Sequence, residues 1–152
     1  MNKVLVVLVT IAAAALALPN IVAAQQREVV NLPGAPAPNP NSVLSNAIKI
    51  GNMMWISGQL GTTQGDTVGN IEKETTAALD KIKKSLEAGG FAMKDVVAVQ
   101  VYLVDIKDFQ KMNGVYRTYF TDMKPTRTTV QVAGLASPMA RVEITVTAMK
   151  TP

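Results

Sequence analysis

The sequence contains no cysteine and no histidine. The absence of cysteine excludes disulfide bonds and thiolate chemistry, so the fold must be held together by packing alone. The absence of histidine removes the usual general base, the commonest metal ligand and every Ser-His nucleophile system. Any catalysis by this chain must therefore use carboxylate, arginine, hydroxyl, amide or backbone groups.

Aromatic residues are also few, at 5% of the chain, and the formal net charge is only +4. Binding of single-stranded nucleic acid usually needs basic and aromatic side chains interleaved along one surface. Lys81, Lys83 and Lys84 do cluster, but all three belong to a single predicted helix. We interpret them as a solvated helix surface and expect no nucleic-acid partner.

The N-terminus has the pattern of a secretory signal peptide, which we assign to residues 1–24. Lys3 provides a positive charge, residues 4–18 are uncharged and apolar, and Pro19 ends that run. These 15 apolar residues are fewer than the ~20 that a membrane span needs, and no cysteine is present to carry a lipid anchor. We expect cleavage after Ala24, a periplasmic or secreted mature protein, and no membrane association after cleavage.

The mature chain divides into an extended, proline-rich segment, residues 25–42, and a single domain, residues 43–152. Within the domain, strand-like and helix-like periodicities alternate along the chain. They predict a hairpin, a helix, a central strand, a second helix and a final pair of strands, at residues 47–57, 70–88, 96–104, 105–120 and 125–147 respectively. This order is typical of an α+β domain whose mixed sheet carries both helices on one side.

The final pair of strands carries two charged side chains that are candidates for catalysis. Arg127 and Thr129 point away from Val130 in the first strand, and Glu143 points away from Val142 in the second. We therefore expect Arg127 and Glu143 to project from the polar faces of two neighbouring strands. A solvated sheet face is the alternative interpretation of these side chains.

Asn113 is a further candidate, because it shares the apolar face of the second predicted helix with Phe109 and Tyr116. A buried amide without hydrogen-bond partners costs about 1–3 kcal/mol. Asn113 is therefore either a satisfied core amide or a functional group.

Seven segments of the chain, in order, read SNAIKIGN, WISGQLG, LEAGG, VYLVDIKDF, NGVY followed by YF, PTRTTVQVA and VEI. They span nearly all of residues 43–149, and in this order they resemble the reactive intermediate deaminase family, RidA/YjgF. Each segment alone is a weak signal, but seven in the right order are a strong one.

The resemblance implies a chorismate-mutase-like α+β fold that assembles as a homotrimer with clefts between subunits. It also implies hydrolysis of 2-imino acids, or of their enamine tautomers, to 2-keto acids and ammonia, with no metal or cofactor. By position, Arg127 would hold the substrate carboxylate, and Glu143 would orient and deprotonate the attacking water. Ser57 and Gly58 would line the pocket, and Asn113 would support it.

The chain departs from the family's pattern at two positions. Leu44 stands where well-known members have a tyrosine, and we expect this difference to change which substrate side chains fit the pocket. Thr129 stands where they have a cysteine, but the family mechanism can use the backbone carbonyl there, which threonine retains. Leu44 and Thr129 therefore complete the set of expected substrate-binding residues.

Two other functions fit the same residues. A non-catalytic trimer that binds a small carboxylate through Arg127 is favoured somewhat by the export signal, because enzymes that release imino acids are typically cytosolic. A nuclease or translation inhibitor, an activity attributed to some relatives, is disfavoured. Export would separate the protein from the ribosome, and no histidine is available as a base.

Overall fold

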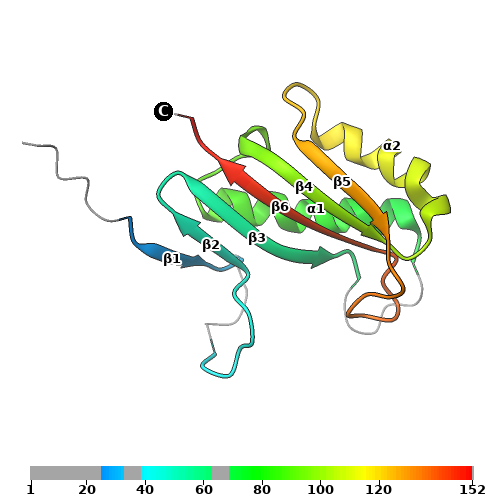
Figure 1. Ribbon diagram of the computed structural model, residues 1–152, viewed down its shortest axis with the longest axis horizontal. Coiled ribbons are helices and arrows are strands. Elements are labelled where there is room, and N and C mark those ends of the chain that lie inside the picture. Colours follow the sequence, from blue (N-terminus) through cyan, green and yellow to red (C-terminus); the bar gives the residue numbers. More distant parts are fainter. Residues whose placement is uncertain (1–24, 33–38, 63–68, 152) are drawn as a thin grey trace, which may run out of the picture.

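The computed structural model of the chain describes residues 25–32, 39–62 and 69–151. Six strands and two helices make up the fold (Figure 1): β1 Arg27–Val30, β2 Ala47–Ile50, β3 Met53–Leu60, α1 Ile71–Ala88, β4 Val96–Leu103, α2 Phe109–Tyr119, β5 Thr126–Gln131 and β6 Val142–Met149. Two short 3-10 turns precede β4 and α2. The expected signal peptide, residues 1–24, lies outside the described residues.

The strands form one mixed sheet in the order β1-β2-β3-β6-β4-β5. Only β4 and β5 pair in parallel, and α2 provides the crossover between them. The last strand, β6, inserts between β3 and β4 and pairs antiparallel with both. The α+β class and the mixed sheet are confirmed.

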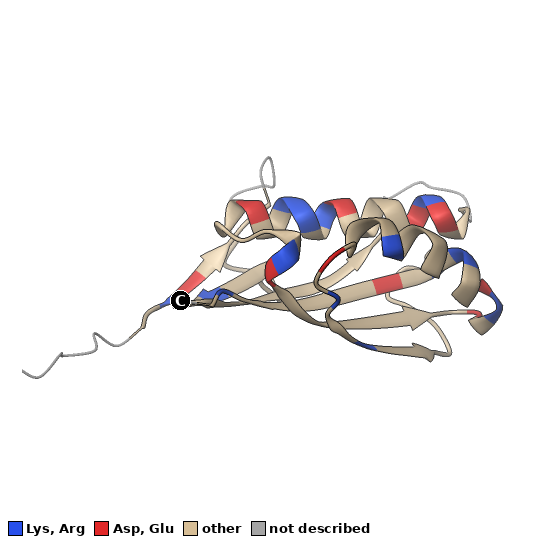
Figure 2. Ribbon diagram, turned by 90° about the horizontal axis from the view of Figure 1, so that it is seen from above, with Lys and Arg blue, Asp and Glu red and all other residues tan. Residues whose placement is uncertain are grey.

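Both helices pack against the same face of this sheet (Figure 2). Helix α1 begins where Asn70 accepts hydrogen bonds from the backbone N–H groups of Glu72 and Lys73, at 2.9 and 3.2 Å. It ends before Gly90, whose φ of +80° only glycine adopts readily. These boundaries match the predicted ones. Neither helix of the described part combines the length and hydropathy of a membrane span.

The second helix starts later than its sequence indicates. The predicted helix begins at residue 105, but Asp105 accepts from the Lys107 N–H and caps a short 3-10 turn, Ile106–Asp108. Helix α2 then begins at Phe109, and its buried residues Met112 and Tyr116 face the sheet. The predicted start of this helix at residue 105 is therefore one short turn too early.

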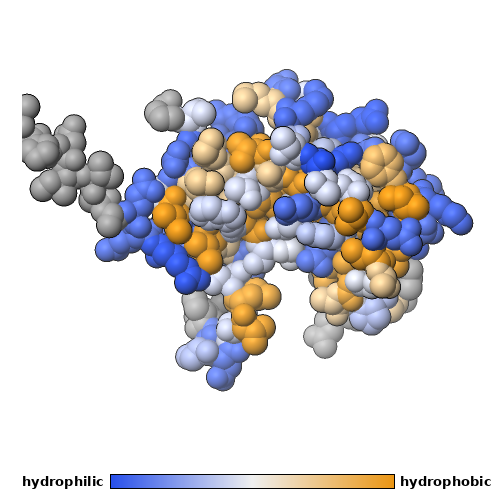
Figure 3. Space-filling view, viewed as in Figure 1, coloured by the Kyte–Doolittle hydropathy of each residue, from blue (hydrophilic) through white to orange (hydrophobic). Residues whose placement is uncertain are grey.

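The core lies between the helices and the sheet. Val142, Ile144 and Val146 of β6 are buried there, against Leu79 and Ile82 of α1. We call the opposite side of the sheet, which no helix of the described residues covers, the open face (Figure 3). It exposes apolar side chains, with Val29, Trp55 and Val130 at 43%, 40% and 41% of their full accessibility.

Part of the proline-rich segment belongs to the sheet. Its strand β1 pairs antiparallel with β2, and Val30 is only 6% exposed. The sequence pattern predicts one extended segment over residues 25–42. In the structure, residues 27–30 form the edge strand of the sheet, and residues 33–38 lie outside the described part. The difference arises because four residues are too few for a clear period-two pattern.

Candidate functional site

Arg127 and Glu143 lie on opposite faces of the sheet. Strand β4 lies between their strands, β5 and β6. Arg127 pairs with Val99 of β4, and Val99 pairs with Val146 of β6, which points to the helix side. Arg127 therefore points to the helix side as well. Glu143 pairs with Tyr102 and points to the open face. The expectation that both side chains project from neighbouring strands into one site is therefore wrong within one chain.

The reason is that the two strands turn their polar sides in opposite directions. Strand β6 is central, so its helix-facing side must be apolar. Strand β5 is at the edge, and there the helix-facing side carries Arg127, Thr129 and Gln131, while Val130 faces the open side. Polar and apolar side chains alternate along each strand as predicted. This alternation alone does not determine whether the polar side chains of a strand point to the helix side or to the open face of the sheet.

On the helix side, the guanidinium of Arg127 rests on two aromatic rings of α2. Its central carbon is 4.4 Å from the ring centroid of Tyr116 and 5.6 Å from that of Phe109, both within cation–π range. Phe109 and Tyr116 are two helical turns apart, and the half-buried Asn113 lies between them on the same face. Arg127 is thus not part of a freely solvated sheet face.

Two buried hydroxyl groups lie in this region. The hydroxyls of Tyr116 and Thr129 are inaccessible to solvent and have no hydrogen-bond partner among the described residues. Burial raises the pKa of the Tyr116 hydroxyl, and the neighbouring Arg127 opposes part of that rise. We call Asn113, Arg127 and Thr129, together with the two rings, the Arg127 group.

On the open face, Glu143 lies against Gly58. A Cβ built on Gly58 would overlap Glu143 Oε1, so only glycine fits there with the carboxylate in this position. The approach is created by a bulge in β3, where Ser57 and Gly58 interrupt the register with β6. Thr145 Oγ1 fastens the bulge by donating to the Ile56 carbonyl at 2.5 Å.

Ser57 connects this bulge to the loop that precedes β2. Its hydroxyl donates to the Ser45 carbonyl at 2.7 Å, and its N–H donates to the Asn46 carbonyl at 2.9 Å. Leu44, in the same loop, is 64% exposed. Leu44, Ser57 and Trp55 line an open hollow of about 1090 Å³. We call Leu44, Ser57, Gly58 and Glu143 the Glu143 group.

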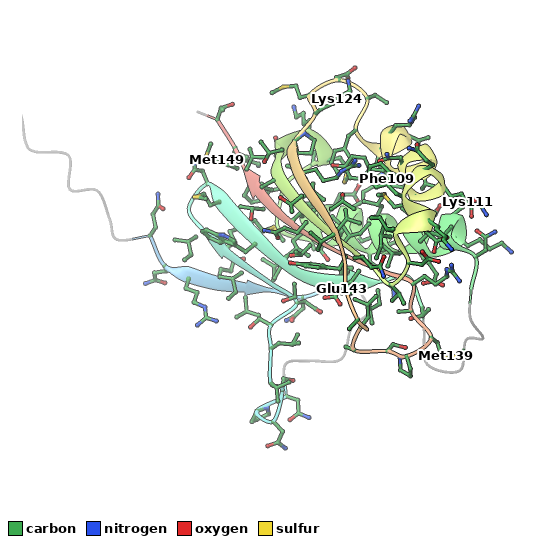
Figure 4. All side chains as sticks on the ribbon, turned by 45° about the vertical axis from the view of Figure 1, so that its right-hand side comes forward. Phe109, Lys111, Lys124, Met139, Glu143 and Met149 are labelled. Atoms are coloured by element: carbon green, nitrogen blue, oxygen red, sulfur yellow. The ribbon has the colours of Figure 1, made fainter. Side chains whose placement is uncertain are left out.

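The seven predicted site residues therefore form two groups rather than one. Figure 4 shows the separation: Phe109, beside Arg127, belongs to the α2 side, whereas Glu143 is on β6. Within the described part of the chain, the ion pairs are Lys49–Glu28 and Arg141–Asp108, so neither Arg127 nor Glu143 is neutralised by an ion pair there. No cluster of acidic side chains suited to a metal ion occurs among the described residues.

The sequence interpretation did not identify the rings that hold Arg127. Phe109 and Tyr116 carry the pattern of a core-facing helix, and nothing local indicates that an arginine from a strand packs on them. The one indication in the sequence is their spacing around Asn113, because a polar residue in an otherwise apolar helix face suggests that this face contacts a polar group.

Comparison with known proteins gives consistent results. The family model described as Endoribonuclease L-PSP matches residues 34–150. A RutC family protein of Saccharolobus solfataricus is 43% identical over 117 residues, 75% of this chain and 92% of that protein. A 2-iminobutanoate/2-iminopropanoate deaminase of Dermatophagoides farinae is 38% identical over 111 residues, 71% of this chain and 86% of that protein.

The solved structure of E. coli TdcF with bound serine superimposes with a TM-score of 0.72 at 25% identity, covering 82% of this chain and 99% of that one. The fold, the order of the motifs and the extent of the matches agree, and the chain belongs to the RidA/YjgF family, whose family model carries the Endoribonuclease L-PSP description.

Proposed function

We propose that this protein hydrolyses reactive 2-imino acids, or their enamine tautomers, to 2-keto acids and ammonia. The observation that supports this most directly is the chemistry of the two groups. One presents an arginine without a carboxylate partner among the described residues, and the other presents a carboxylate at a glycine bulge. A relative from D. farinae that is named a deaminase supports the same reaction class.

The site needs two copies of the chain. Because Arg127 and Glu143 lie on opposite faces, one chain cannot place both around a small substrate. In a homotrimer with clefts between subunits, the edge strand β5 of one copy lies beside the open face of another. Arg127 of the first copy and Glu143 of the second then line the same cleft. The open face, with its exposed Trp55 and Val130, suits burial against a second copy.

In the proposed cleft, the planar Arg127 guanidinium binds the substrate carboxylate through two parallel hydrogen bonds, a geometry that lysine lacks. Glu143 takes a proton from water, and the water oxygen forms a bond to the C=N carbon. The nitrogen receives that proton together with the electron pair of the C=N π-bond, which gives a carbinolamine. Glu143 then passes the carbinolamine's hydroxyl proton to the nitrogen, the C–N bond breaks, and ammonia leaves as the carbonyl forms. Because imines hydrolyse readily in water, positioning and one base are sufficient.

The remaining residues of the two groups shape the cleft. Ser57 and Gly58 line it beside Glu143, and Asn113 supports the side on which Arg127 lies. Thr129 contributes its backbone carbonyl. Leu44, on an exposed loop, adjusts the space for the substrate side chain. We further propose that the protein acts after export to the periplasm or the cell exterior, following cleavage of residues 1–24.

One assay tests the proposed function. An amino-acid oxidase generates 2-iminobutanoate in the presence of semicarbazide, and the purified protein should lower the rate of semicarbazone formation. Arg127→Ala should not lower it, whereas Arg117→Ala, which removes an exposed arginine of α2, should behave as the wild type.

Two other outcomes would replace this function. If wild type does not change semicarbazone formation but 2-ketobutyrate raises its melting temperature, the protein is a non-catalytic carboxylate-binding trimer. If wild type cleaves RNA and Arg127→Ala does not, the activity is the one that the family model's description names.

A further inference from the structure

Arg127 is a long, flexible side chain on an edge strand, yet its guanidinium has a defined place. The nearer of the two rings is that of Tyr116, at 4.4 Å, and Phe109 is at 5.6 Å. A guanidinium over a ring face is attracted by the negative charge of the π-system. This attraction does not use the N–H donors of the guanidinium in hydrogen bonds. The donors of Arg127 therefore remain available for a ligand.

Tyr116 is itself held firmly. It is 8% exposed, and its ring packs against Phe120 with a centroid distance of 4.6 Å and a tilt of 35°. Tyr116 lies in the last turn of α2, Phe120 directly follows that helix, and both are part of the core. A ring fixed in the core is a rigid platform, whereas the arginine above it would otherwise sample many rotamers.

The hydroxyl of Tyr116 does not explain its position. The oxygen is buried, has no hydrogen-bond partner among the described residues and is inaccessible to a ligand in this structure. A buried hydroxyl without a partner reduces stability rather than adding to it. Arg127 opposes the rise in the pKa of this hydroxyl, so the two groups are near each other, but the contact of defined geometry is the one between the guanidinium and the ring face.

We propose that Tyr116 is a positioning residue: its ring face pre-orients the Arg127 guanidinium for carboxylate binding. The role of the orientation rests on the proposed function, in which Arg127 binds the substrate carboxylate. Pre-orientation removes part of the entropic cost of fixing the arginine when the ligand binds. Loss of the ring should therefore weaken ligand binding without removing the charge that attracts the ligand.

The test compares Tyr116→Phe, which keeps the ring, with Tyr116→Leu, which removes it. Tyr119→Leu is the matched control, because Tyr119 is also a half-buried tyrosine of α2 but donates its hydroxyl to Asp80 at 2.7 Å. Three measurements are made on the intact assembly: the Kd of 2-ketobutyrate by calorimetry, the melting temperature, and the NMR signal of the Arg127 Nε–H group, assigned by its loss in Arg127→Lys.

In Tyr116→Leu, we expect the Kd of 2-ketobutyrate to rise about ten-fold, which corresponds to about 1.4 kcal/mol. The Arg127 Nε–H signal should lose its upfield ring-current shift and should narrow as the side chain becomes mobile. Tyr116→Phe should keep the Kd within about two-fold of the wild-type value and keep the shifted signal. Tyr119→Leu should lower the melting temperature and leave the Kd and the Arg127 signal unchanged.

The proposal is overturned if Tyr116→Leu folds, binds 2-ketobutyrate as wild type does and keeps the Arg127 signal in place. It is also overturned if Tyr116→Phe weakens binding as much as Tyr116→Leu, because the hydroxyl would then be the active part. If wild type neither binds 2-ketobutyrate nor lowers semicarbazone formation, the proposed function fails. The Arg127 signal in Tyr116→Leu still decides whether the ring positions the arginine.

Discussion

Gly58 lies directly against the carboxylate of Glu143, and no room is left for a Cβ between them. Replacing Gly58 by alanine should displace the carboxylate from its place on the open face. Because a misplaced general base loses much of its effect, we expect Gly58→Ala to lower kcat about ten-fold or more in the semicarbazone assay. Gly58 is exposed in the single chain but lies in the proposed cleft, so the melting temperature is measured as well, to separate a loss of assembly from a loss of kcat.

Gly114→Ala is the matched control for that substitution. Gly114 lies in α2, and a Cβ there meets no atom within 4 Å. Alanine favours the helix by about 1 kcal/mol relative to glycine, so this variant should be slightly more stable and fully active. A Gly58→Ala protein with wild-type kcat would show that the position of the Glu143 carboxylate does not matter.

Arg127→Lys keeps the positive charge but loses the two-pronged geometry. If Arg127 binds the substrate carboxylate through two hydrogen bonds, each charge-assisted bond contributes about 1.5–3 kcal/mol. We therefore expect kcat/KM to fall ten- to a hundred-fold, mostly through KM, with a larger loss in Arg127→Ala. Steady-state kinetics at several substrate concentrations separate the two parameters. Equal kcat/KM values for lysine and arginine would contradict bidentate binding.

The ion pair of Arg141 and Asp108 should stabilise the fold without taking part in the reaction. Arg141 Nε donates to Asp108 Oδ2 at 3.0 Å, and the backbone N–H of Arg141 donates to Glu74 Oε2 at 2.8 Å. The start of β6 is therefore joined to α1 and to the 3-10 turn that precedes α2. Asp108 is 7% exposed. Asp108→Ala should lower the free energy of unfolding by about 1–3 kcal/mol in urea titrations.

The double variant Asp108→Ala, Arg141→Leu should lose less than the two single variants together, because neither member of this ion pair is then left without the other. Strictly additive losses would show that the two side chains are not coupled in solution.

Tyr119 should make stability fall at alkaline pH. Burial and the hydrogen bond to Asp80 raise its pKa from 10.0 to about 12. The phenol is protonated in both states below pH 10, so its contribution is fully present there. Between pH 10 and 12 the unfolded chain ionises first, and stability falls. Tyr119→Phe should fall less steeply over this interval in urea titrations, and an identical slope would contradict the assignment.

Much of the fold is predictable from the sequence because its signals are local. Asn70 and Gly90 define α1 by a cap and a left-handed turn, and Gly51, with a φ of +57°, forms the hairpin between β2 and β3. The alternation in β5 and β6 is also read correctly. These features depend on residues within a few positions of each other.

The arrangement of the site is not predictable in the same way. That Arg127 and Glu143 face opposite sides follows from the insertion of β6 between β3 and β4, a pairing of distant segments. The bulge at Gly58 exists only with β6 as its partner. The alternation of polar and apolar residues identifies which side chains of a strand share a face. The order of the strands in the sheet, which depends on distant segments, places the Arg127 group and the Glu143 group on opposite faces.

The central claim is that each site combines Arg127 of one copy with Glu143 of another, and mixed assemblies test it most directly. Arg127→Ala, carrying an affinity tag, and Glu143→Gln are unfolded together in equal amounts, refolded and captured through the tag. Each variant refolded alone should be inactive. In a random mixture of trimers, one site in each mixed trimer regains both side chains, so the mixture before capture should recover about a quarter of wild-type activity. If the tag retains mixed assemblies that are no more active than the separate variants, the shared site is contradicted.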